Sequence, residues 1–431
     1  MIITVVGMGK IGLPLAAQFA SKGHRVLGAD VNPRTVELIN SGKVPFPGEP
    51  GLEERIAKAV DEELLEATLD TPWAVSQSRA VVVVVPLFVD AEGTPDFGWM
   101  DSATEKIGEG LEPGTLVTFE TTLPVGTTRN RFTPALEKAS GLRAGVDFWV
   151  SFSPERVLTG RVFEDLRKYP KLIGGINSAS ANAALDFYNA VLDFDDRPDL
   201  TKPNGVWDLG SSEASELAKL AETTYRDVNI GLANQFARFA DKAGIDVYSV
   251  IEACNSQFFS HIHQPGIAVG GHCIPIYPQM YLWNDPEATI VRAARAANRA
   301  MPAYAVGVLE EKIGSLQGRR VAVLGAAYRG GVKETAFSGV FDVVDSLLSH
   351  GAVPLVHDPM YSDDELMALG FEVYHLGDPI EAVIIQANHI EYGTLHPEDL
   401  PGARAIIDGR KAVSSALAKA IPTIVLGSFP A

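Results

Sequence analysis

The fold is decided by the first twelve residues, Met1-Ile2-Ile3-Thr4-Val5-Val6-Gly7-Met8-Gly9-Lys10-Ile11-Gly12. Ile2–Val6 is a β-branched run of the kind that forms a buried strand, and an apolar helical pattern continues through Leu15 and Phe19. The glycines between them have the spacing G-x-G-x-x-G, which allows a tight turn and lets a pyrophosphate approach backbone N–H groups at a helix N-terminus. The stretch therefore predicts the strand, turn and helix of a dinucleotide-binding domain.

Asp30 indicates which dinucleotide this domain binds. A second strand is expected over Arg25–Ala29, and Asp30 follows it, 18 residues after Gly12. An acidic side chain at this place accepts a hydrogen bond from the ribose 2′-hydroxyl and repels a 2′-phosphate, which favours NAD over NADP. Two alternatives stay open: a turn of this type that binds no dinucleotide, and Asp30 as an ordinary residue at a strand end.

The composition is that of a globular protein with several domains. Of 431 residues, 46% are apolar and 21% charged, and at ~150 residues per domain the length suggests about three domains. A net charge of −18 disfavours nucleic acid and anionic membranes as partners. The longest apolar run, residues 80–89, contains Pro86 and is shorter than the ~20 residues of a membrane span. The two cysteines do not make a disulfide framework, so we expect a reducing, cytoplasmic location.

A second α/β region is expected behind a helical middle. Ser212–Ala243 has the pattern of one long helix with Ser212 as its N-cap, and helical pattern resumes over residues 287–302 after a loop at 264–278. From about residue 320 strands alternate with helices again. The predicted fold class is therefore α/β, with two Rossmann-like doubly wound domains joined by a central helical region. We expect boundaries at 1–200, 201–302 and 303–431.

The loop before residue 278 gives one cysteine an unusual setting. Gly270-Gly271-His272-Cys273-Ile274-Pro275 places a thiol among glycines and a proline within a helical region. Such a thiol is a nucleophile where its neighbours favour the thiolate, and the alternative is a structural cysteine. Cys254 has no such neighbours and is interpreted as structural. His261 and His263 form a pair without a third ligand, so we expect no metal site.

Seven motifs along the chain carry a resemblance to a known family. They are the Gly7 fingerprint, Glu120-Thr121-Thr122-Leu123-Pro124-Val125-Gly126, Ser153-Pro154-Glu155-Arg156-Val157, Glu216-Leu217-Ala218-Lys219-Leu220, the loop from Gly270 to Pro275, Leu324-Gly325-Ala326-Ala327-Tyr328 and His357-Asp358-Pro359. With them the chain resembles the nucleotide-sugar 6-dehydrogenases, the superfamily of UDP-glucose and UDP-N-acetylmannosamine dehydrogenases, nearly from end to end.

The resemblance implies a four-electron oxidation of a UDP-sugar at C6, with NAD as the cofactor. It implies an NAD-binding first domain, a central dimerisation and catalytic region and a C-terminal UDP-sugar-binding domain, in a homodimer built on the long helix. The implied catalytic residues are Cys273, which forms a thiohemiacetal and then a thioester, Lys219, Glu155 and Thr122. Lys219 also has Thr223 and Arg226 on its helix face, although a lysine on a long helix is usually solvated.

The resemblance also implies two sets of binding residues. Cofactor contacts are expected from Gly7, Gly9, Lys10, Ile11, Gly12, Asp30, Pro86, Thr122 and Arg329. Substrate contacts are expected from Glu155, Arg156, Val157, Lys219, Thr223, Gly270, Gly271, His272, Tyr328 and Lys333.

The sub-branch follows from residues around two of the motifs. Glu155-Arg156-Val157-Leu158-Thr159-Gly160 and the Gly-Gly-His-Cys-Ile-Pro loop are similar to the UDP-N-acetylhexosamine branch, with the manno epimer favoured over the gluco epimer. Three positions depart from the family pattern. Tyr277 replaces an aspartate, Thr223 an asparagine and Ala336 an arginine, whose charge Lys333 or Arg329 could supply.

Three other functions remain open at this point. A UDP-glucose 6-dehydrogenase is the nearest alternative. A β-hydroxyacid dehydrogenase also joins a Rossmann domain to a long helix with a lysine, but it needs neither the Cys273 loop nor a second α/β domain. A nucleotide-sugar sensor with weakened catalysis would keep the fold without forming a thioester.

Overall fold

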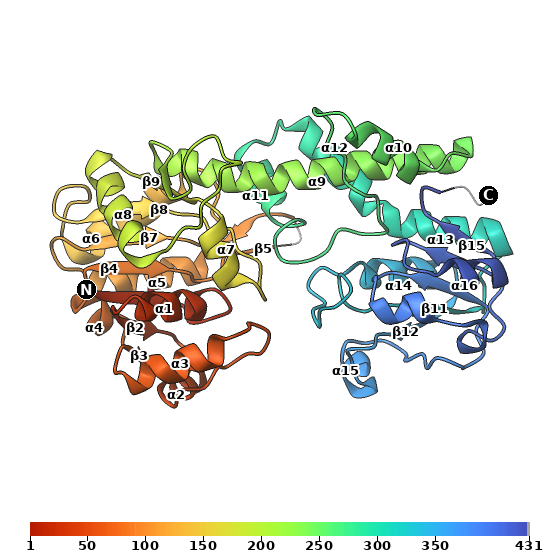
Figure 1. Ribbon diagram of the computed structural model, residues 1–431, viewed down its shortest axis with the longest axis horizontal. Coiled ribbons are helices and arrows are strands. Elements are labelled where there is room, and N and C mark those ends of the chain that lie inside the picture. Colours follow the sequence, from red (N-terminus) through yellow and green to blue (C-terminus); the bar gives the residue numbers. More distant parts are fainter. Residues whose placement is uncertain (91, 429–431) are drawn as a thin grey trace. The chain divides into compact units, whose positions relative to one another are not determined.

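The computed structural model describes residues 1–90 and 92–428, and the chain forms two compact units, 1–221 and 222–431 (Figure 1). The first unit is built on a sheet with the strand order β10-β9-β8-β7-β4-β1-β2-β3. Its strands are β1 (Ile2–Val6), β2 (Arg25–Ala29), β3 (Leu65–Thr68), β4 (Ala80–Val83), β7 (Leu116–Phe119), β8 (Trp149–Phe152), β9 (Lys171–Gly175) and β10 (Val206–Asp208). A short hairpin pairs β5 (Phe88–Val89) with β6 (Pro95–Asp96).

Helices cover both faces of this sheet, as its buried β-branched strands require. They are α1 (Gly12–Ser21), α2 (Pro33–Asn40), α3 (Leu52–Asp61), α4 (Thr71–Ser76), α5 (Gly98–Glu109), a π-helical turn (Thr128–Phe132), α6 (Thr133–Ser140), α7 (Val162–Lys168) and α8 (Ser178–Val191). Helices α1 and α8 share one face, where Phe19 and Phe187 have ring centroids 5.7 Å apart. On the other face, Thr4 Oγ1 donates to the carbonyl of Ala74 in α4 at 2.9 Å.

The strand directions bring the ends of several strands to one edge. β1, β2, β4, β7 and β8 run parallel, so the loops after them lie at the same carboxyl edge. These loops hold most of the residues that the sequence singled out in the first unit: the glycine turn after β1, Asp30 after β2, Pro86 after β4, Thr122 after β7 and Glu155 after β8. In open α/β sheets this edge is where ligands bind.

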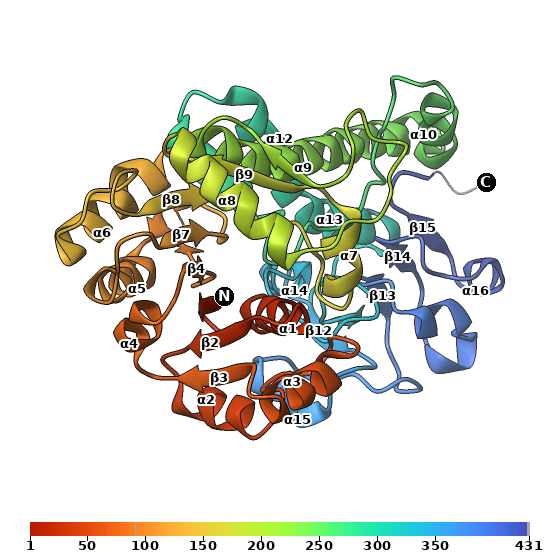
Figure 2. The same cartoon turned by 60° about the vertical axis from the view of Figure 1, so that its left-hand side comes forward.

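The second unit contains a helical region and a smaller parallel sheet (Figure 2). Its helices are the later turns of α9 (Ser212–Ala243), then α10 (Val247–Asn255), α11 (Tyr277–Asn284), α12 (Thr289–Arg299), α13 (Met301–Ile313), α14 (Gly339–Ser349), α15 (Asp363–Ala368), α16 (Ser415–Ala420) and the 3-10 turns Ile390–Thr394 and Pro397–Asp399. The strands are β11 (Arg320–Leu324), β12 (Val353–His357), β13 (Ala382–Ile385), β14 (Ile406–Asp408) and β15 (Thr423–Val425). Their order in the sheet is β12-β11-β13-β14-β15. Helices α13 and α14 pack on one of its faces.

The predicted fold class is confirmed, and the differences lie at helix ends. α9 begins at Ser212, so its cap is Ser211, whose Oγ accepts from the N–H of Ala214 at 3.1 Å. Ser212 itself is fully buried. The helix predicted over 287–302 is interrupted: α12 ends at Arg299 and α13 begins at Met301, because Pro302 suits a first helical turn and disrupts a helix interior. α11 begins inside the stretch predicted as a loop.

Within the described residues, none of the helices combines the length and the apolar character that crossing a bilayer requires.

Candidate active site and nucleotide-binding residues

The glycine turn after β1 has the shape that a dinucleotide requires. Gly7 has φ +93°, a left-handed conformation that favours glycine, and a Cβ on Gly12 would lie 1.8 Å from the carbonyl oxygen of Gly7. Around Gly9 no atom lies within 4 Å of where a Cβ would stand. Helix α1 starts here without a side-chain capping hydrogen bond, so its first N–H groups suit a pyrophosphate. Lys10 is exposed and Ile11 half-buried in the same turn.

The Asp30 carboxylate is hydrogen-bonded to this turn. Its Oδ2 accepts from the N–H of Met8 at 2.8 Å, and its Oδ1 accepts from the N–H of Asn32 at 2.8 Å. These bonds fix the carboxylate beside the glycine turn while each oxygen keeps a lone pair for a ribose hydroxyl. The turn and Asp30 together therefore fit NAD.

The loops after β4 and β7 complete this edge. Pro86 is exposed, and Thr122 is buried with 4% of its surface accessible. The neighbouring Thr121 donates from Oγ1 to the carbonyl of Val85 at 2.7 Å, which ties the two loops together.

Glu155 and Lys219 meet in the first unit. The Lys219 ammonium donates to the backbone carbonyl of Glu155, not to its carboxylate. Glu155 Oε1 accepts from the N–H groups of Arg156 at 2.5 Å and Val157 at 2.7 Å, so its own loop orients the side chain. Arg156 donates to the carbonyl of Pro170 at 3.1 Å and lies near the ring of Tyr169. These four residues of the predicted site are thus brought together.

The first turn of α9 is fastened to the loop that follows Thr122. Glu216 is fully buried, and its carboxylate accepts from the N–H of Gly126 at 2.5 Å and of Thr128 at 2.8 Å. Burial raises the pKa of Glu216 to about 7, although these hydrogen bonds oppose the shift. One turn earlier, the guanidinium of Arg129 pairs with Glu213 and lowers the pKa of that carboxyl to about 2. The position of Lys219 depends on these anchors.

In the second unit, the cysteine loop packs directly on the C-terminal sheet domain. A Cβ on Gly270 would lie 2.6 Å from Cβ of Tyr328, and the N–H of Gly271 donates to the carbonyl of Ala336 at 2.9 Å. His272 Nε2 lies 3.4 Å from a carboxylate oxygen of Glu334. The glycines are therefore required by close packing. The Cys273 side chain is exposed, and its carbonyl accepts from the N–H of Tyr277 where α11 begins.

The two candidate replacements for the missing arginine differ in their surroundings. Lys333 is bonded to both oxygens of Glu365, at 2.5 and 2.7 Å, so its charge is already compensated. Arg329 is exposed, donates to the carbonyl of Gly330 at 3.3 Å and lies near the ring of Tyr328.

Arg410 is a candidate ligand-binding residue that the sequence analysis missed. It follows β14 and donates to the carbonyls of Gln386 at 2.8 Å and Ala268 at 3.1 Å. No carboxylate among the described residues lies within ion-pair distance of its guanidinium. Burial lowers its pKa to about 10, so the side chain remains charged at neutral pH. The only signal in the sequence was a basic pair at a strand end, Arg410-Lys411, which is common on surfaces.

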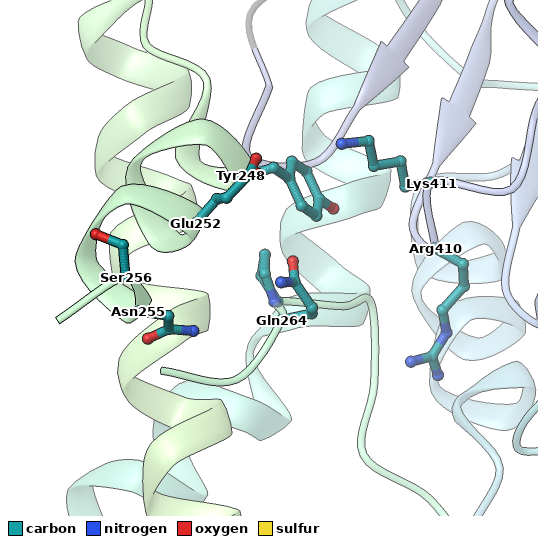
Figure 3. Close-up of a pocket in the computed structure, with 8 residues that line it drawn as sticks. Tyr248, Glu252, Asn255, Ser256, Gln264, Arg410 and Lys411 are labelled. Carbon is teal, nitrogen blue, oxygen red and sulfur yellow. The ribbon is translucent and has the colours of Figure 1, made fainter. Parts of the chain in front are cut away.

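Arg410 lines an open hollow of about 760 Å³ at the start of the cysteine loop. Figure 3 shows Arg410 and Lys411 on one side, Asn255 and Ser256 on the other, and Gln264 between them. Tyr248, Glu252 and Pro265 complete the lining. The hollow therefore combines cationic, amide and aromatic side chains, the groups that hold a nucleotide.

Comparisons with known proteins identify the domains in which these residues lie. The NAD binding domain of the UDP-glucose/GDP-mannose dehydrogenase family matches residues 1–192, its central domain residues 213–300, and its UDP binding domain residues 322–415. A UDP-N-acetyl-D-mannosamine dehydrogenase from Pyrococcus horikoshii is 34% identical over 421 residues, which are 96% of each chain.

The chain belongs to the UDP-glucose/GDP-mannose dehydrogenase family. It is an NAD-dependent nucleotide-sugar dehydrogenase with a C-terminal UDP binding domain, as the resemblance implied.

Two solved structures extend the comparison. A structure of a UDP-D-ManNAc dehydrogenase from Pyrococcus horikoshii matches with a TM-score of 0.87 at 31% identity, covering 99% of both chains. A UDP-glucose dehydrogenase from Pyrobaculum islandicum matches with a TM-score of 0.85 at 29% identity, covering 99% of this chain and 98% of that one. The fold is therefore shared by relatives that are named for different sugars. No group of three or more metal-ligating side chains is found among the residues that the structure describes.

Proposed function

We propose that this member of the family oxidises C6 of a UDP-N-acetylhexosamine, UDP-N-acetylmannosamine above others, to the uronic acid. The observation that carries the proposal is the exposed thiol of Cys273 on a glycine loop packed against the UDP binding domain. A thiol in this setting suits covalent capture of an aldehyde at C6. Per sugar, two NAD⁺ are reduced and one water is consumed.

Cys273 supplies the step that a simple alcohol dehydrogenase lacks. NAD, when bound, accepts a hydride from C6 in each oxidation. The first oxidation leaves an aldehyde, to which the Cys273 thiolate adds, forming a C–S bond and a thiohemiacetal. This adduct again has a carbinol hydrogen, so a second oxidation is possible and leaves a thioester. Water then cleaves the C–S bond, releasing the carboxylate and the thiol.

Lys219 and Glu155 act on charge and protons in this sequence. Each oxidation and each addition changes the charge on the oxygen at C6, and an ammonium from Lys219 stabilises the oxyanion. The carboxylate of Glu155 takes the proton of the water that attacks the thioester. Thr122, at the end of β7, binds near C6 through its hydroxyl.

The hollow beside Arg410 is proposed to accept the nucleotide half of the substrate. The loop from Gln264 to Cys273 starts at the hollow and ends at the thiol, so a sugar nucleotide extended along this loop places its diphosphate near Arg410 and C6 near Cys273. A guanidinium whose partners are carbonyls keeps an uncompensated charge, which a diphosphate neutralises.

The epimer is proposed on two grounds. The Pyrococcus relatives are named for UDP-ManNAc, and the residues after Glu155 and around Cys273 are similar to the N-acetylhexosamine branch. UDP-glucose is the alternative substrate, for which the Pyrobaculum protein is named. If catalysis in this chain differs from that of its relatives, we expect the cause at Tyr277 and Thr223, which replace an aspartate and an asparagine of the family.

The first experiment counts NADH per sugar, by absorbance, with UDP-ManNAc, UDP-GlcNAc, UDP-GalNAc and UDP-glucose. Two NADH per UDP-ManNAc support the proposal. Two NADH on UDP-glucose alone favour the alternative substrate. One NADH per sugar means that oxidation stops at the aldehyde, and tight binding without NADH indicates a sensor.

We predict that Cys273→Ser lowers uronate formation by more than about 10³-fold, because a serine hydroxyl is a much weaker nucleophile toward an aldehyde than a cysteine thiol. Intact-protein mass spectrometry under turnover should detect a sugar adduct on the wild type and none on the variant. Cys254→Ser is the control and should keep full activity. Full uronate output from the Cys273 variant would exclude the covalent mechanism.

We predict that Arg410→Met weakens UDP binding by about 10- to 100-fold, the effect of losing a charged hydrogen bond of ~1.5–3 kcal/mol. Calorimetric titration with UDP measures this, and NAD binding should not change. Arg404→Met, an exposed arginine of the same domain, is the matched control. Unchanged affinity for UDP in a folded Arg410 variant would contradict the assignment of the hollow.

A further inference from the structure

A buried ionic cluster lies behind Glu155 in the first unit. Glu120, after β7, is fully buried, and Lys171, the first residue of β9, is 6% exposed. The Lys171 ammonium donates to one Glu120 oxygen at 2.6 Å, and the hydroxyl of Tyr188 in α8 donates to the other at 2.6 Å. The ammonium also lies 4.9 Å from the centre of the Tyr188 ring. Lys171 is thus held rigidly by groups from two other elements.

The strand register directs this cluster toward Glu155. β8 and β9 are antiparallel, with Phe152 opposite Gly174, so the chain that continues past β8 comes opposite the start of β9. Glu155 Oε2 lies 4.0 Å from the Lys171 ammonium. The Glu155 side chain is 13% exposed. Its Oε2 is buried and has no hydrogen-bond partner among the described residues, whereas Oε1 is held by two N–H groups.

The charges around Glu155 leave Lys171 as the cation that its free oxygen faces. From α9, the Lys219 ammonium donates to the Glu155 backbone carbonyl. From its own loop, Arg156 donates its side chain to Pro170. After β7, burial raises the pKa of the Glu120 carboxyl; the Lys171 ammonium opposes that rise, and repulsion from the Glu155 carboxylate adds to it. Tyr188 is kept neutral by burial, which raises its pKa well above the usual range.

We propose that Lys171 is a positioning residue for Glu155: held by Glu120 and Tyr188, its ammonium keeps Oε2 of the Glu155 carboxylate in the orientation that a base needs. The inference rests on the function proposed for Glu155. Oε2 of Glu155 lies 4.0 Å from the ammonium of Lys171, which attracts it electrostatically at a distance too long for a hydrogen bond. This attraction fixes the orientation of the carboxylate while Oε2 accepts no hydrogen bond from the described residues.

A purely structural role makes a different prediction. If Lys171 served to neutralise the buried Glu120 and nothing more, its removal would lower stability and leave the chemistry of a folded enzyme unchanged. If it positions Glu155, its removal slows hydrolysis of the thioester while the affinities for NAD and UDP-sugar stay the same.

The experiment compares Lys171→Met and Lys171→Arg with the wild type, with Lys168→Met as the control. Lys168 is an exposed lysine of the preceding helix that pairs with Glu164. In Lys171→Met we expect hydrolysis at pH 7 to slow about 10-fold and the Cys273 adduct to accumulate, so that kcat falls. KM should not change. Lys171→Arg keeps the charge and should retain the wild-type kcat without accumulation of the adduct, as should Lys168→Met.

The double variant Lys171→Met/Glu120→Gln covers the case in which the single variant fails to fold. It removes both buried charges, and we expect wild-type thermal stability with slower hydrolysis and accumulation of the Cys273 adduct. An unchanged kcat and no adduct accumulation in the folded variants would overturn the proposal. If the wild type itself forms no thioester, the proposed function fails first, and the adduct measurement on the wild type separates the two results.

Discussion

At the scale of single residues, we propose that NAD binding depends on the Asp30 carboxylate beside the turn of glycines. Asp30 is fixed by the N–H groups of Met8 and Asn32, so it does not need to reorient when a ribose binds. A preorganised acceptor loses little conformational entropy on binding. On this proposal, the fixed Asp30 carboxylate accepts from a ribose hydroxyl and repels a 2′-phosphate.

We predict that Asp30→Ala raises the dissociation constant for NAD by about 10- to 100-fold, since a hydrogen bond to a charged group contributes ~1.5–3 kcal/mol. The preference for NAD over NADP should narrow at the same time, because the repulsion of the 2′-phosphate is lost. Fluorescence titration with both cofactors measures this. Asp61→Ala, at the exposed end of α3, should bind both as the wild type does. An unaltered ratio would show that Asp30 does not contact the ribose.

At the scale of elements, the first turn of α9 carries two glutamates whose pKa values are shifted in opposite directions. Burial dominates for Glu216, while the ion pair with Arg129 dominates for Glu213. The turn is thereby fastened to the loop after β7, and Lys219 follows one turn later on the same helix. The electrostatics of this junction should therefore be visible in the stability of the protein.

We predict that Glu216→Gln flattens the dependence of stability on pH. The pKa of Glu216 is raised to about 7 in the folded state, so the folded chain binds more protons than the unfolded chain between about pH 4.5 and 7. The contribution of Glu216 to the free energy of unfolding is therefore fully present below about pH 4.5 and is lost as the pH rises through 7. Its maximum is on the order of 3 kcal/mol. Thermal unfolding midpoints between pH 4.5 and 8 measure the change.

Glu213→Gln is the matched control for this prediction. The pKa of Glu213 is lowered to about 2, so its contribution is present above about pH 4.5 and is lost only as the pH falls toward 2. Its removal should therefore leave the slope between pH 4.5 and 8 as in the wild type. Equal slopes for all three proteins would contradict the shift at Glu216.

At the scale of the whole molecule, α9 presents an apolar stripe in its later turns. Leu232, Phe236 and Phe239 repeat at helical spacing and expose 43%, 39% and 67% of their surfaces. Tyr225, on the same stripe, is 57% exposed. Large apolar side chains clustered on one helix face are typical of an interface between proteins. We propose that a second copy of this chain covers the stripe, as the resemblance implied.

We predict that the wild type is a homodimer at micromolar concentration and that Phe236→Glu/Phe239→Glu is a monomer, because two buried charges per copy destabilise an apolar interface. Light scattering after size exclusion measures the mass. Leu348→Glu, an exposed apolar residue of α14, should not change it. A monomeric wild type would contradict the proposal.

The sequence by itself determined the features that local patterns encode. The glycine spacing, the β-branched strands and the helical period over Ser212–Ala243 depend on neighbouring residues, so the fold class and the place of Asp30 at the end of β2 were predictable. Tertiary structure decided which side chains meet. Lys171 reaches Glu120 across 51 residues, and Arg410 reaches the carbonyl of Ala268 across 142. Strand order and register bring such pairs together, and no local pattern records them, because a buried pair is specified by the packing of whole elements.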